Sequence, residues 1–320
     1  MSHDPTGPVG EAVLEIRGLC KSYGKVHAVK NLSLSIPQGA IHGFLGPNGA
    51  GKTTTIRSIM NIVVPDGGEI LFGGHPLDRQ RLDRIGYLPE ERGLYRKMTC
   101  LDQLVFLAEL KSVPRSEARH KAEAWLERVG LSDWAGRKID ALSKGMQQKV
   151  QLASVFQFDP ELVILDEPFS GLDPLNVEVL RDIIREENRR GCTIIFSTHM
   201  LPEAEKLCDS ICLIEGGEVI LEGDLAKVKR DFPLDSVKAA FVDGRDMPSG
   251  LPGVLRTERN EGAWSLILSE GADHQKLLDG LREEGALSLF SAHRPSLDEI
   301  FISAVRKRRG AAFATQEVAS

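Results

Sequence analysis

The sequence lacks the features that staple small secreted proteins or anchor a chain in a membrane. Its five cysteines are an odd number scattered over 320 residues, so no disulfide framework is indicated. Nowhere do 18 or more apolar residues run together, and the sequence therefore predicts no membrane-spanning helix. We expect a soluble protein of a reducing compartment, and any membrane spans it works with must come from another chain.

A strong charge of one sign is also missing. Forty basic and 46 acidic residues give a net charge of −6, which argues against a generic nucleic-acid binder, since such proteins are usually basic. The hydrophobic share of 42% is that of an ordinary globular protein and argues against extensive disorder. At about 150 residues per domain, the length suggests two domains.

The sequence does contain a repeated alternation of strand and helix patterns. Short continuous apolar runs stand at Ile41–Gly46, Leu162–Asp166 and Thr193–Thr198, and such runs are typical of strands covered on both faces. Helical patterns follow at Thr54–Val63 and Asp173–Asn188. Strands that alternate with helices predict an α/β fold with a parallel sheet.

Other regions have a different pattern. Residues 96–145 are mostly helical in pattern with few strand signals, which predicts a helical insert. The chain beyond the α/β region shows short strands and two helices, so we expect a small α+β domain over residues 225–306. Residues 1–11 and 307–320 are expected to be flexible tails.

A glycine-rich segment stands between a predicted strand and a predicted helix. It reads Gly-Pro-Asn-Gly-Ala-Gly-Lys-Thr, the pattern G-x-x-x-x-G-K-[ST]. Its glycines let the backbone turn tightly so that N–H groups cradle phosphates, and the helix adds its positive end. We expect Lys52 to contact the β- and γ-phosphates and the Thr53 hydroxyl to bind Mg²⁺, although a plain glycine turn is the alternative. The candidate nucleotide-binding residues are Gly46, Pro47, Asn48, Gly49, Ala50, Gly51, Lys52, Thr53 and Thr54.

Two acidic residues end the second apolar run. In Leu-Val-Ile-Leu-Asp-Glu-Pro, Asp166 stands where a carboxylate can hold Mg²⁺ through water. Glu167 can polarise an attacking water, because successive residues at a strand end point in different directions. A solvated strand end could carry the same pair, but the phosphate loop favours the catalytic interpretation.

Three more segments stand in a telling order along the chain: LSKGMQQKV at 142–150, SGLDP at 170–174, and FSTHM around His199. With the phosphate loop and the LVILDEP segment, this ordered set resembles the nucleotide-binding subunit of ATP-binding cassette (ABC) transporters, over roughly residues 13–222. The remainder, ending HRPSLDEIFISAV, resembles the C-terminal extension of bacterial ABC export subunits of the sodium-extrusion and multidrug type. The resemblance implies a P-loop NTPase of ABC type over residues 12–223, with a parallel-sheet core, an antiparallel subdomain and a helical insert.

The resemblance also assigns roles to single residues. Ser143 and Gly145 match the signature loop that contacts the γ-phosphate bound by the other subunit. Asp173 matches the loop that couples the two sites across the dimer. His199 matches the switch histidine, which reads the γ-phosphate and orients the water. Glu167 and His199 are therefore the candidate catalytic residues.

Two further positions follow from the same resemblance. Tyr23 matches the aromatic residue that stacks on adenine, the alternative being a core aromatic. Glu90 stands where the family usually carries glutamine, and a carboxylate there can still hold Mg²⁺ or its water. The signature loop departs from the family at Lys144 and Met146, which affects its detailed contacts and not its identity.

The implied function is that of an ATPase, with ATP and Mg²⁺ as its cofactors. Two copies packed head to tail would bury two ATP molecules and drive a separate membrane permease, with the chain peripheral on the cytoplasmic face of the membrane. The C-terminal resemblance implies export, and no nucleic-acid partner is expected. Two alternatives are a non-transport ABC-type ATPase acting on ribosomes or DNA and another P-loop enzyme such as a small-molecule kinase, in which the signature loop would have no purpose.

Overall fold

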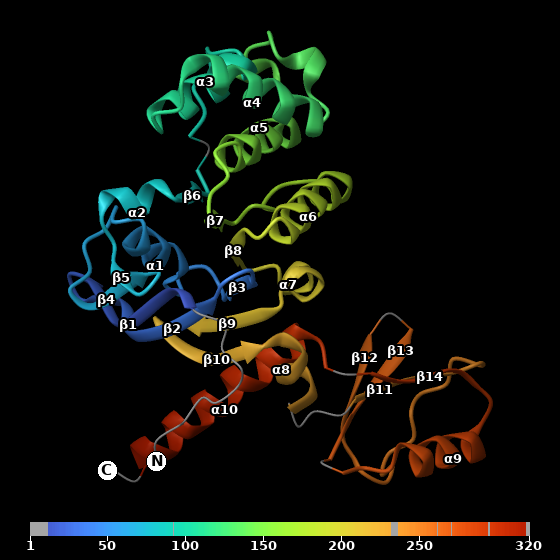
Figure 1. The fold of residues 1–320 in the computed structure, drawn as a ribbon. Coiled ribbons are helices and arrows are strands. Elements are labelled where there is room, and N and C mark those ends of the chain that lie inside the picture. Colours follow the sequence, from blue (N-terminus) through green and yellow to red (C-terminus); the bar gives the residue numbers. More distant parts are fainter. Residues whose placement is uncertain are drawn as a thin grey trace. The chain divides into compact units, whose positions relative to one another are not determined.

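The computed structural model describes residues 12–91, 93–231, 236–260, 262–269, 271–293 and 295–317. It divides into two compact units with a boundary between Glu222 and Gly223 (Figure 1). The predicted N-terminal tail, residues 1–11, lies outside the described residues.

The larger unit opens with an antiparallel sheet. Its strands, in spatial order, are β2 (Val26–Pro37), β1 (Ala12–Tyr23), β4 (Gly67–Phe72) and β5 (His75–Pro76). In the second half of β2 buried apolar residues alternate with exposed ones, as expected for a strand with one face on the core. This sheet is the antiparallel subdomain that the sequence resemblance implied.

A six-stranded sheet forms the centre of the same unit. In spatial order it contains β10 (Glu218–Asp224), β9 (Ser210–Glu215), β3 (Ile41–Leu45), β8 (Thr193–Thr198), β7 (Leu162–Asp166) and β6 (Ile85–Leu88). All neighbouring pairs from β9 to β6 are parallel. Every residue of β3, β7 and β8 is buried, so their continuous apolar runs reflect coverage on both faces and the predicted α/β fold is confirmed.

Helices complete the larger unit. They are α1 (Lys52–Ile59), α2 (Arg79–Asp83), α3 (Cys100–Leu110), α4 (Arg115–Arg128), the 3₁₀ turns η1 (Ser132–Trp134) and η2 (Ile139–Ala141), α5 (Lys144–Phe156), α6 (Pro174–Arg189) and α7 (Leu201–Leu207). Helices α3, α4 and α5 gather beyond the end of the sheet (Figure 1). At the junction, Arg128 of α4 forms ion pairs with Glu186 and Glu187 of α6, which ties this helical region to the core.

The helix after the phosphate loop differs from the prediction of Thr54–Val63. Helix α1 begins at Lys52 and ends at Ile59. Asn61 has a left-handed φ of 53°, a conformation that commonly terminates helices and that asparagine tolerates. The apolar residues that follow therefore belong to a turn.

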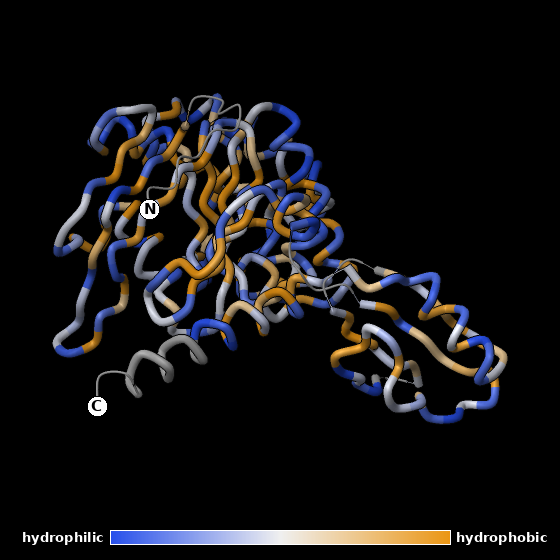
Figure 2. Tube along the Cα trace, turned by 90° about the horizontal axis from the view of Figure 1, so that it is seen from below, coloured by the Kyte–Doolittle hydropathy of each residue, from blue (hydrophilic) through white to orange (hydrophobic). Residues whose placement is uncertain are grey.

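One apolar core joins the two sheets of the larger unit. It includes Leu14 and Ile16 of β1, Phe44 of β3, Ile56 of α1 and Ile164 of β7, each at most 2% exposed. Figure 2 shows the hydrophobic stretches in the interior of this unit. This packing fixes α1, and with it the phosphate loop, against the ends of the parallel strands.

The smaller unit has its own antiparallel sheet and core. It contains α8 (Leu225–Asp231), β11 (Ser236–Phe241), β12 (Val254–Asn260), β13 (Ala263–Leu268), α9 (His274–Glu284), β14 (Leu287–His293) and α10 (Leu297–Glu317). The strand order is β12-β13-β11-β14, and α9 packs Leu277 and Leu281 onto Val237 and Leu266. The prediction of a flexible tail over residues 307–320 is wrong up to Glu317, because α10 continues as a helix to that residue. Residues 318–320 lie outside the described residues.

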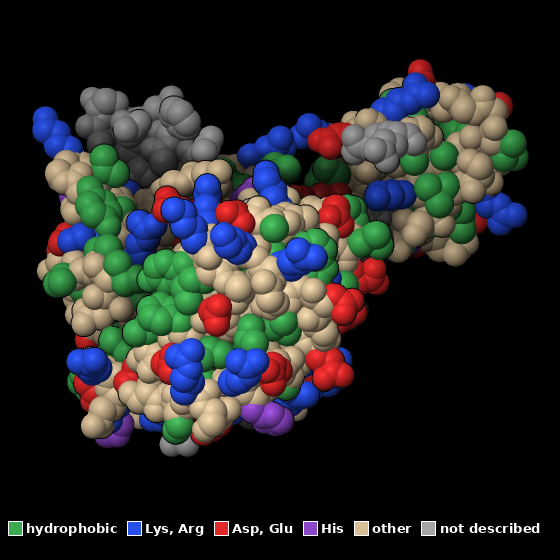
Figure 3. Space-filling model, turned by 90° about the horizontal axis from the view of Figure 1, so that it is seen from above, with side chains coloured by type: hydrophobic (Ala, Val, Ile, Leu, Met, Phe, Trp, Pro, Cys, Tyr) green, Lys and Arg blue, Asp and Glu red, His purple; other side chains and the backbone are tan. Residues whose placement is uncertain are grey.

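The surface of the larger unit carries both signs of charge. On the face seen in Figure 3, Lys and Arg side chains are interspersed with Asp and Glu beside a group of hydrophobic side chains. Among the described residues, no helix is both long and apolar enough to cross a bilayer.

Candidate functional site

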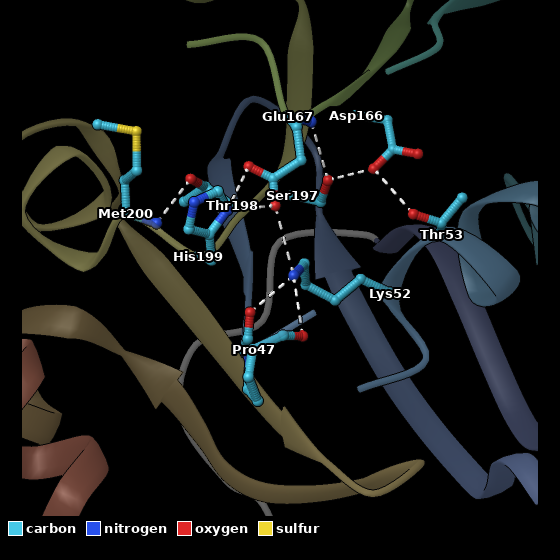
Figure 4. Close-up of polar contacts among 10 residues, drawn as sticks. Pro47, Lys52, Thr53, Asp166, Glu167, Ser197, Thr198, His199 and Met200 are labelled. Carbon is cyan, nitrogen blue, oxygen red and sulfur yellow. Dashed lines mark hydrogen bonds and ion pairs between the residues drawn. The ribbon is translucent and has the colours of Figure 1, made fainter. Parts of the chain in front are cut away.

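Three neighbouring strands deliver the candidate residues to one edge of the central sheet. Strands β3, β8 and β7 are adjacent and parallel, so their carboxyl ends meet at the same edge. The phosphate loop follows β3, His199 follows β8, and Asp166 and Glu167 end β7 (Figure 4). Residues that lie far apart in sequence thus form one polar cluster.

The phosphate loop needs glycine for conformation and for space. Gly46 and Gly51 have φ of 153° and 108°, in the region that disfavours other residues. A Cβ on Gly46 would lie 2.2 Å from the carbonyl oxygen of Ile214, and one on Gly51 would lie 2.4 Å from that of Ala28. Helix α1 starts after Gly51 with no side-chain cap in the described chain, so the N–H groups of its first turn are available to an anion.

Lys52 is buried beneath this loop. Its ammonium donates to the carbonyl oxygens of Gly46 at 2.6 Å and Pro47 at 3.3 Å, and it lies 3.4 Å from Oε1 of Glu167. A buried cation is tolerated only with such partners. The same ammonium therefore connects the phosphate loop to the acidic pair.

Asp166 is 1% exposed, and its two carboxylate oxygens differ in their hydrogen bonds. Its Oδ1 accepts hydrogen bonds from the hydroxyl of Ser197 and from Oγ1 of Thr53, the latter at 3.4 Å. Within the described part of the chain its buried Oδ2 has no donor. Burial raises the pKa of this carboxyl, against the hydrogen bonds from Ser197 and Thr53 that lower it.

These residues fit a magnesium ion. A buried carboxylate oxygen without a donor, beside a threonine hydroxyl, is a donor set suited to a hard cation. The described residues contain no group of three or more His, Cys, Asp or Glu arranged to hold a metal. A magnesium ion would therefore take its other ligands from phosphate and water, as this ion usually does.

Glu167 lies at the centre of the cluster. Its backbone has a left-handed φ of 50°, and its N–H donates to the carbonyl oxygen and the hydroxyl of Ser197 at 3.2 and 3.1 Å. Its carboxylate accepts a hydrogen bond from Nδ1 of His199, with N–O distances of 3.0 and 3.1 Å. Because Glu167 is 8% exposed, this contact places a nearly buried base against a partly exposed histidine.

A cavity of about 310 Å³ opens beside the cluster. It is lined by Tyr23, Ala28, Pro47, Asn48, Gly49, Ala50, Gly51, Lys52, Thr53, Thr54, Glu90 and Glu167. Tyr23 is 50% exposed at the end of β1, so the alternative that it packs in the core is wrong. Tyr23 and Glu90 thus border the same space as the phosphate loop.

The predicted signature and coupling residues form a second group. The Ser143 hydroxyl caps α5 by accepting from the N–H of Met146 at 3.3 Å, and Asp173 caps α6 by accepting from the N–H of Asn176 at 3.0 Å. The Asn176 side chain packs so closely on Gly145 that a Cβ there would lie 2.5 Å from its amide nitrogen. As far as the described residues go, Ser143, Gly145 and Asp173 do not line the cavity of their own chain.

Two residues of these groups were not predicted from the sequence. They are Ser197 and Asn176. Ser197 was visible only as a polar residue in the apolar run of β8. Its contacts depend on β7 lying alongside, and the run itself does not contain that information. Asn176 offered no signal beyond its position three residues after Asp173.

Two protein-family models match this chain, one in each unit. The family described as "ABC transporter" matches residues 29–170. The family described as "ATP-binding protein DrrA1-3-like, C-terminal domain" matches residues 223–305.

Individual proteins agree with these matches. An uncharacterized ABC transporter ATP-binding protein, YhaQ of Bacillus subtilis, is 39% identical and covers 92% of this chain and 98% of its own. The linearmycin resistance ATP-binding protein LnrL of the same organism is 36% identical over 91% of this chain and 97% of its own. The solved structure of cbiO1 from Clostridium perfringens, part of the ABC transporter complex cbiONQ, matches with a TM-score of 0.63 at 29% identity, over 69% of this chain and 92% of that one.

Proposed function

The chain belongs to the ATP-binding subunits of ABC transporters, and we propose that it powers a separate membrane permease by closing and reopening a dimer around ATP. Family membership makes it an ATPase. One observation carries the residue-level proposal. Lys52, Glu167 and His199 meet at one sheet edge, with the cavity of the phosphate loop beside them.

In this proposal the cavity holds ATP. The N–H groups of the phosphate loop and the start of α1 bind the phosphates, and the half-exposed ring of Tyr23 stacks on adenine. Thr53, Asp166 and Glu90 would hold Mg²⁺, directly or through water. Bound Mg²⁺ would neutralise charge on the phosphates during transfer.

Lys52 serves as the link between binding and chemistry. Its ammonium lies 3.4 Å from Oε1 of Glu167 and donates to the carbonyl oxygens of Gly46 and Pro47 in the phosphate loop. When the phosphates of ATP enter, they compete for this ammonium, which leaves the Glu167 carboxylate free to accept a proton. The substrate thus activates its own general base.

Hydrolysis then needs a positioned water. Glu167 accepts a proton from the water as its oxygen bonds to the γ-phosphorus and the bond to the ADP oxygen breaks. The hydrogen bond between Nδ1 of His199 and the Glu167 carboxylate fixes the orientation of the ring, and a proton on Nε2 would let the ring donate to the γ-phosphate. A tautomer held by a carboxylate in this way keeps the ring oriented.

A second copy completes the site. Ser143, Gly145 and Asp173 do not line the cavity of their own chain, within the part that the structure describes, and in the proposed dimer they face the ATP of the partner. The arrangement is a twofold one in which each copy supplies the same residues. Because ATP binds the closed dimer better than the open one, binding shifts the population towards closure and hydrolysis reverses it.

One observation supports export: a relative of this chain is named for linearmycin resistance. We propose that this chain likewise serves an exporter and sits peripherally on the cytoplasmic face of the membrane. Its interspersed surface charges and net charge of −6 do not favour nucleic acid as a partner.

Co-purification tests the proposal. The tagged full chain is isolated from its native cells in mild detergent, and bound proteins are identified by mass spectrometry. The expected partner is a multi-span membrane protein without a phosphate loop of its own. Recovery on ribosomes or DNA instead would overturn the permease assignment and favour the non-transport ATPase.

A further inference from the structure

We propose that Ser197 is a positioning residue whose single hydroxyl sets both acidic residues of the ATP site. The proposal rests on the roles proposed above for Asp166 and Glu167. Ser197 is fully buried and pairs directly with Asp166 across the parallel strands β7 and β8. This register puts its side chain beside the carboxylate that ends β7 (Figure 4).

The hydroxyl of Ser197 uses both its donor and its acceptor capacity. Its only proton is donated to Oδ1 of Asp166. Its oxygen accepts the backbone N–H of Glu167 at 3.1 Å. A serine hydroxyl has one donor and two acceptor sites, so the same atom is committed to both acidic residues at once.

For Asp166, this bond fixes which oxygen remains open. Oδ1 has two hydroxyl donors, Ser197 and the more distant Thr53 at 3.4 Å. If Thr53 were drawn to Mg²⁺, the Ser197 hydroxyl would be the donor that still holds Oδ1, as far as the structure describes the chain. The buried Oδ2, for which the described chain provides no donor, would then remain available to a metal ion or its water.

For Glu167, the bond supports an unfavourable backbone conformation. A left-handed φ at a non-glycine residue persists only where the surroundings hold it, and Glu167 has φ 50°. Its N–H is shared between the carbonyl oxygen and the hydroxyl of Ser197. This clamp keeps the carboxylate within 3.1 Å of His199 Nδ1.

The test uses Ser197→Ala in the full chain, which keeps the backbone bond and removes the hydroxyl. The probe is Mn²⁺, measured by electron paramagnetic resonance in the presence of a non-hydrolysable ATP analogue. Loss of a group that orients a metal ligand typically costs about 10–100-fold in affinity or activity. We expect Mn²⁺ affinity and kcat each to fall at least about tenfold, while affinity for the analogue in EDTA and the KM for ATP stay near wild type.

Ser58→Ala is the matched control. Ser58 is also buried, at 3% exposure, and its hydroxyl donates to the carbonyl oxygen of Thr54 at 3.0 Å, away from both acidic residues. This variant should leave Mn²⁺ affinity and kcat unchanged. Equal losses in Ser58→Ala and Ser197→Ala would mean a general packing effect and would overturn the proposal.

A second variant guards against misfolding. Ser197→Cys keeps the side-chain size but donates and accepts only weakly, so its Mn²⁺ affinity should lie below wild type. Wild-type Mn²⁺ affinity and kcat in both Ser197 variants would refute the positioning role while leaving the ATPase intact. If the wild-type chain itself bound no Mn²⁺ with the analogue, the proposed function of the site would fail, and this proposal with it.

Discussion

The two compact units bury different kinds of residue. Among its described residues, the larger unit buries four charged side chains at 8% exposure or less, those of Lys52, Asp166, Glu167 and Glu187. In the described part of the smaller unit, the buried polar residues are Ser236 and Ser265, and its core is otherwise apolar. Buried charge is costly unless it is paired. Three of the four lie at the proposed ATP site, so the larger unit keeps costly buried charges where the proposed chemistry uses them, whereas the core of the smaller unit is apolar.

Among the buried charges of the larger unit, we expect the largest effect from removing the charge of the proposed base, Glu167. Glu167→Gln keeps the shape but cannot accept a proton, so turnover should fall about 10²- to 10⁴-fold, the range for loss of general-base catalysis. MgATP affinity should persist. Steady-state ATPase assays and titration with a fluorescent ATP analogue measure the two effects.

Glu187→Gln is the control for that change. Glu187 is equally buried but pairs with Arg128 away from the cavity, so its loss should lower stability and leave kcat within a few-fold of wild type. Wild-type turnover in Glu167→Gln would contradict the catalytic assignment.

A substitution in the core of the smaller unit should lower the stability of that unit and leave ATP binding unchanged. Leu281→Ala removes a fully buried side chain of α9 from its core, which typically costs about 2–5 kcal/mol. We expect denaturant unfolding of this unit to shift accordingly while nucleotide affinity is unchanged. Leu289→Ala, at a 38% exposed position, should cost much less. A loss of nucleotide affinity in Leu281→Ala would show that the units are not independent in this respect.

Removing the buried cation should weaken nucleotide binding. A hydrogen bond to a charged group contributes about 1.5–3 kcal/mol, so Lys52→Ala should lower ATP affinity about 10–100-fold. Isothermal titration with ATP and Mg²⁺ provides the measurement. Unchanged affinity would refute the role of Lys52.

The smallest effect is expected from a buried group outside the site, His42, through the dependence of stability on pH. Burial lowers the pKa of His42 to about 4 from its ordinary 6.5, so the unfolded chain takes up the proton first. The free energy of unfolding is therefore not reduced by this histidine above pH 6.5, and it falls as the pH is lowered from 6.5 towards 4. At pH 5 the loss is about 2 kcal/mol. Urea unfolding measures the decrease in the free energy of unfolding between pH 8 and pH 5. This decrease should be smaller by that amount in His42→Gln than in the wild-type protein. An equal drop in both proteins would contradict this origin.

Much of the site could be predicted because its signals are local. The glycines of the phosphate loop, the apolar runs of β3, β7 and β8, and the Asp166–Glu167 pair all lie in short contiguous segments. The parallel sheet then had to bring their ends together. The sequence predicted the roles of Glu167 and His199 separately, whereas their direct contact became visible only in the structure.

The rest depended on contacts between distant segments or on single backbone angles. Ser197 donates to Asp166 from 31 residues away, and nothing in its own run sets it apart from the neighbouring hydroxyl of Thr198. The end of α1 is set by the left-handed Asn61, against an apolar pattern that continues to Val63. Helix α10 extends through a basic stretch that composition alone assigned to a tail.

The proposed mechanism depends on ATP joining two copies of this chain through Ser143. Sedimentation of Glu167→Gln, which should bind MgATP without hydrolysing it, is compared with and without nucleotide and with Ser143→Arg added. We expect a dimer only with MgATP and an intact Ser143. A Glu167→Gln protein that binds MgATP yet stays monomeric, or that dimerises equally with Ser143→Arg, would contradict it.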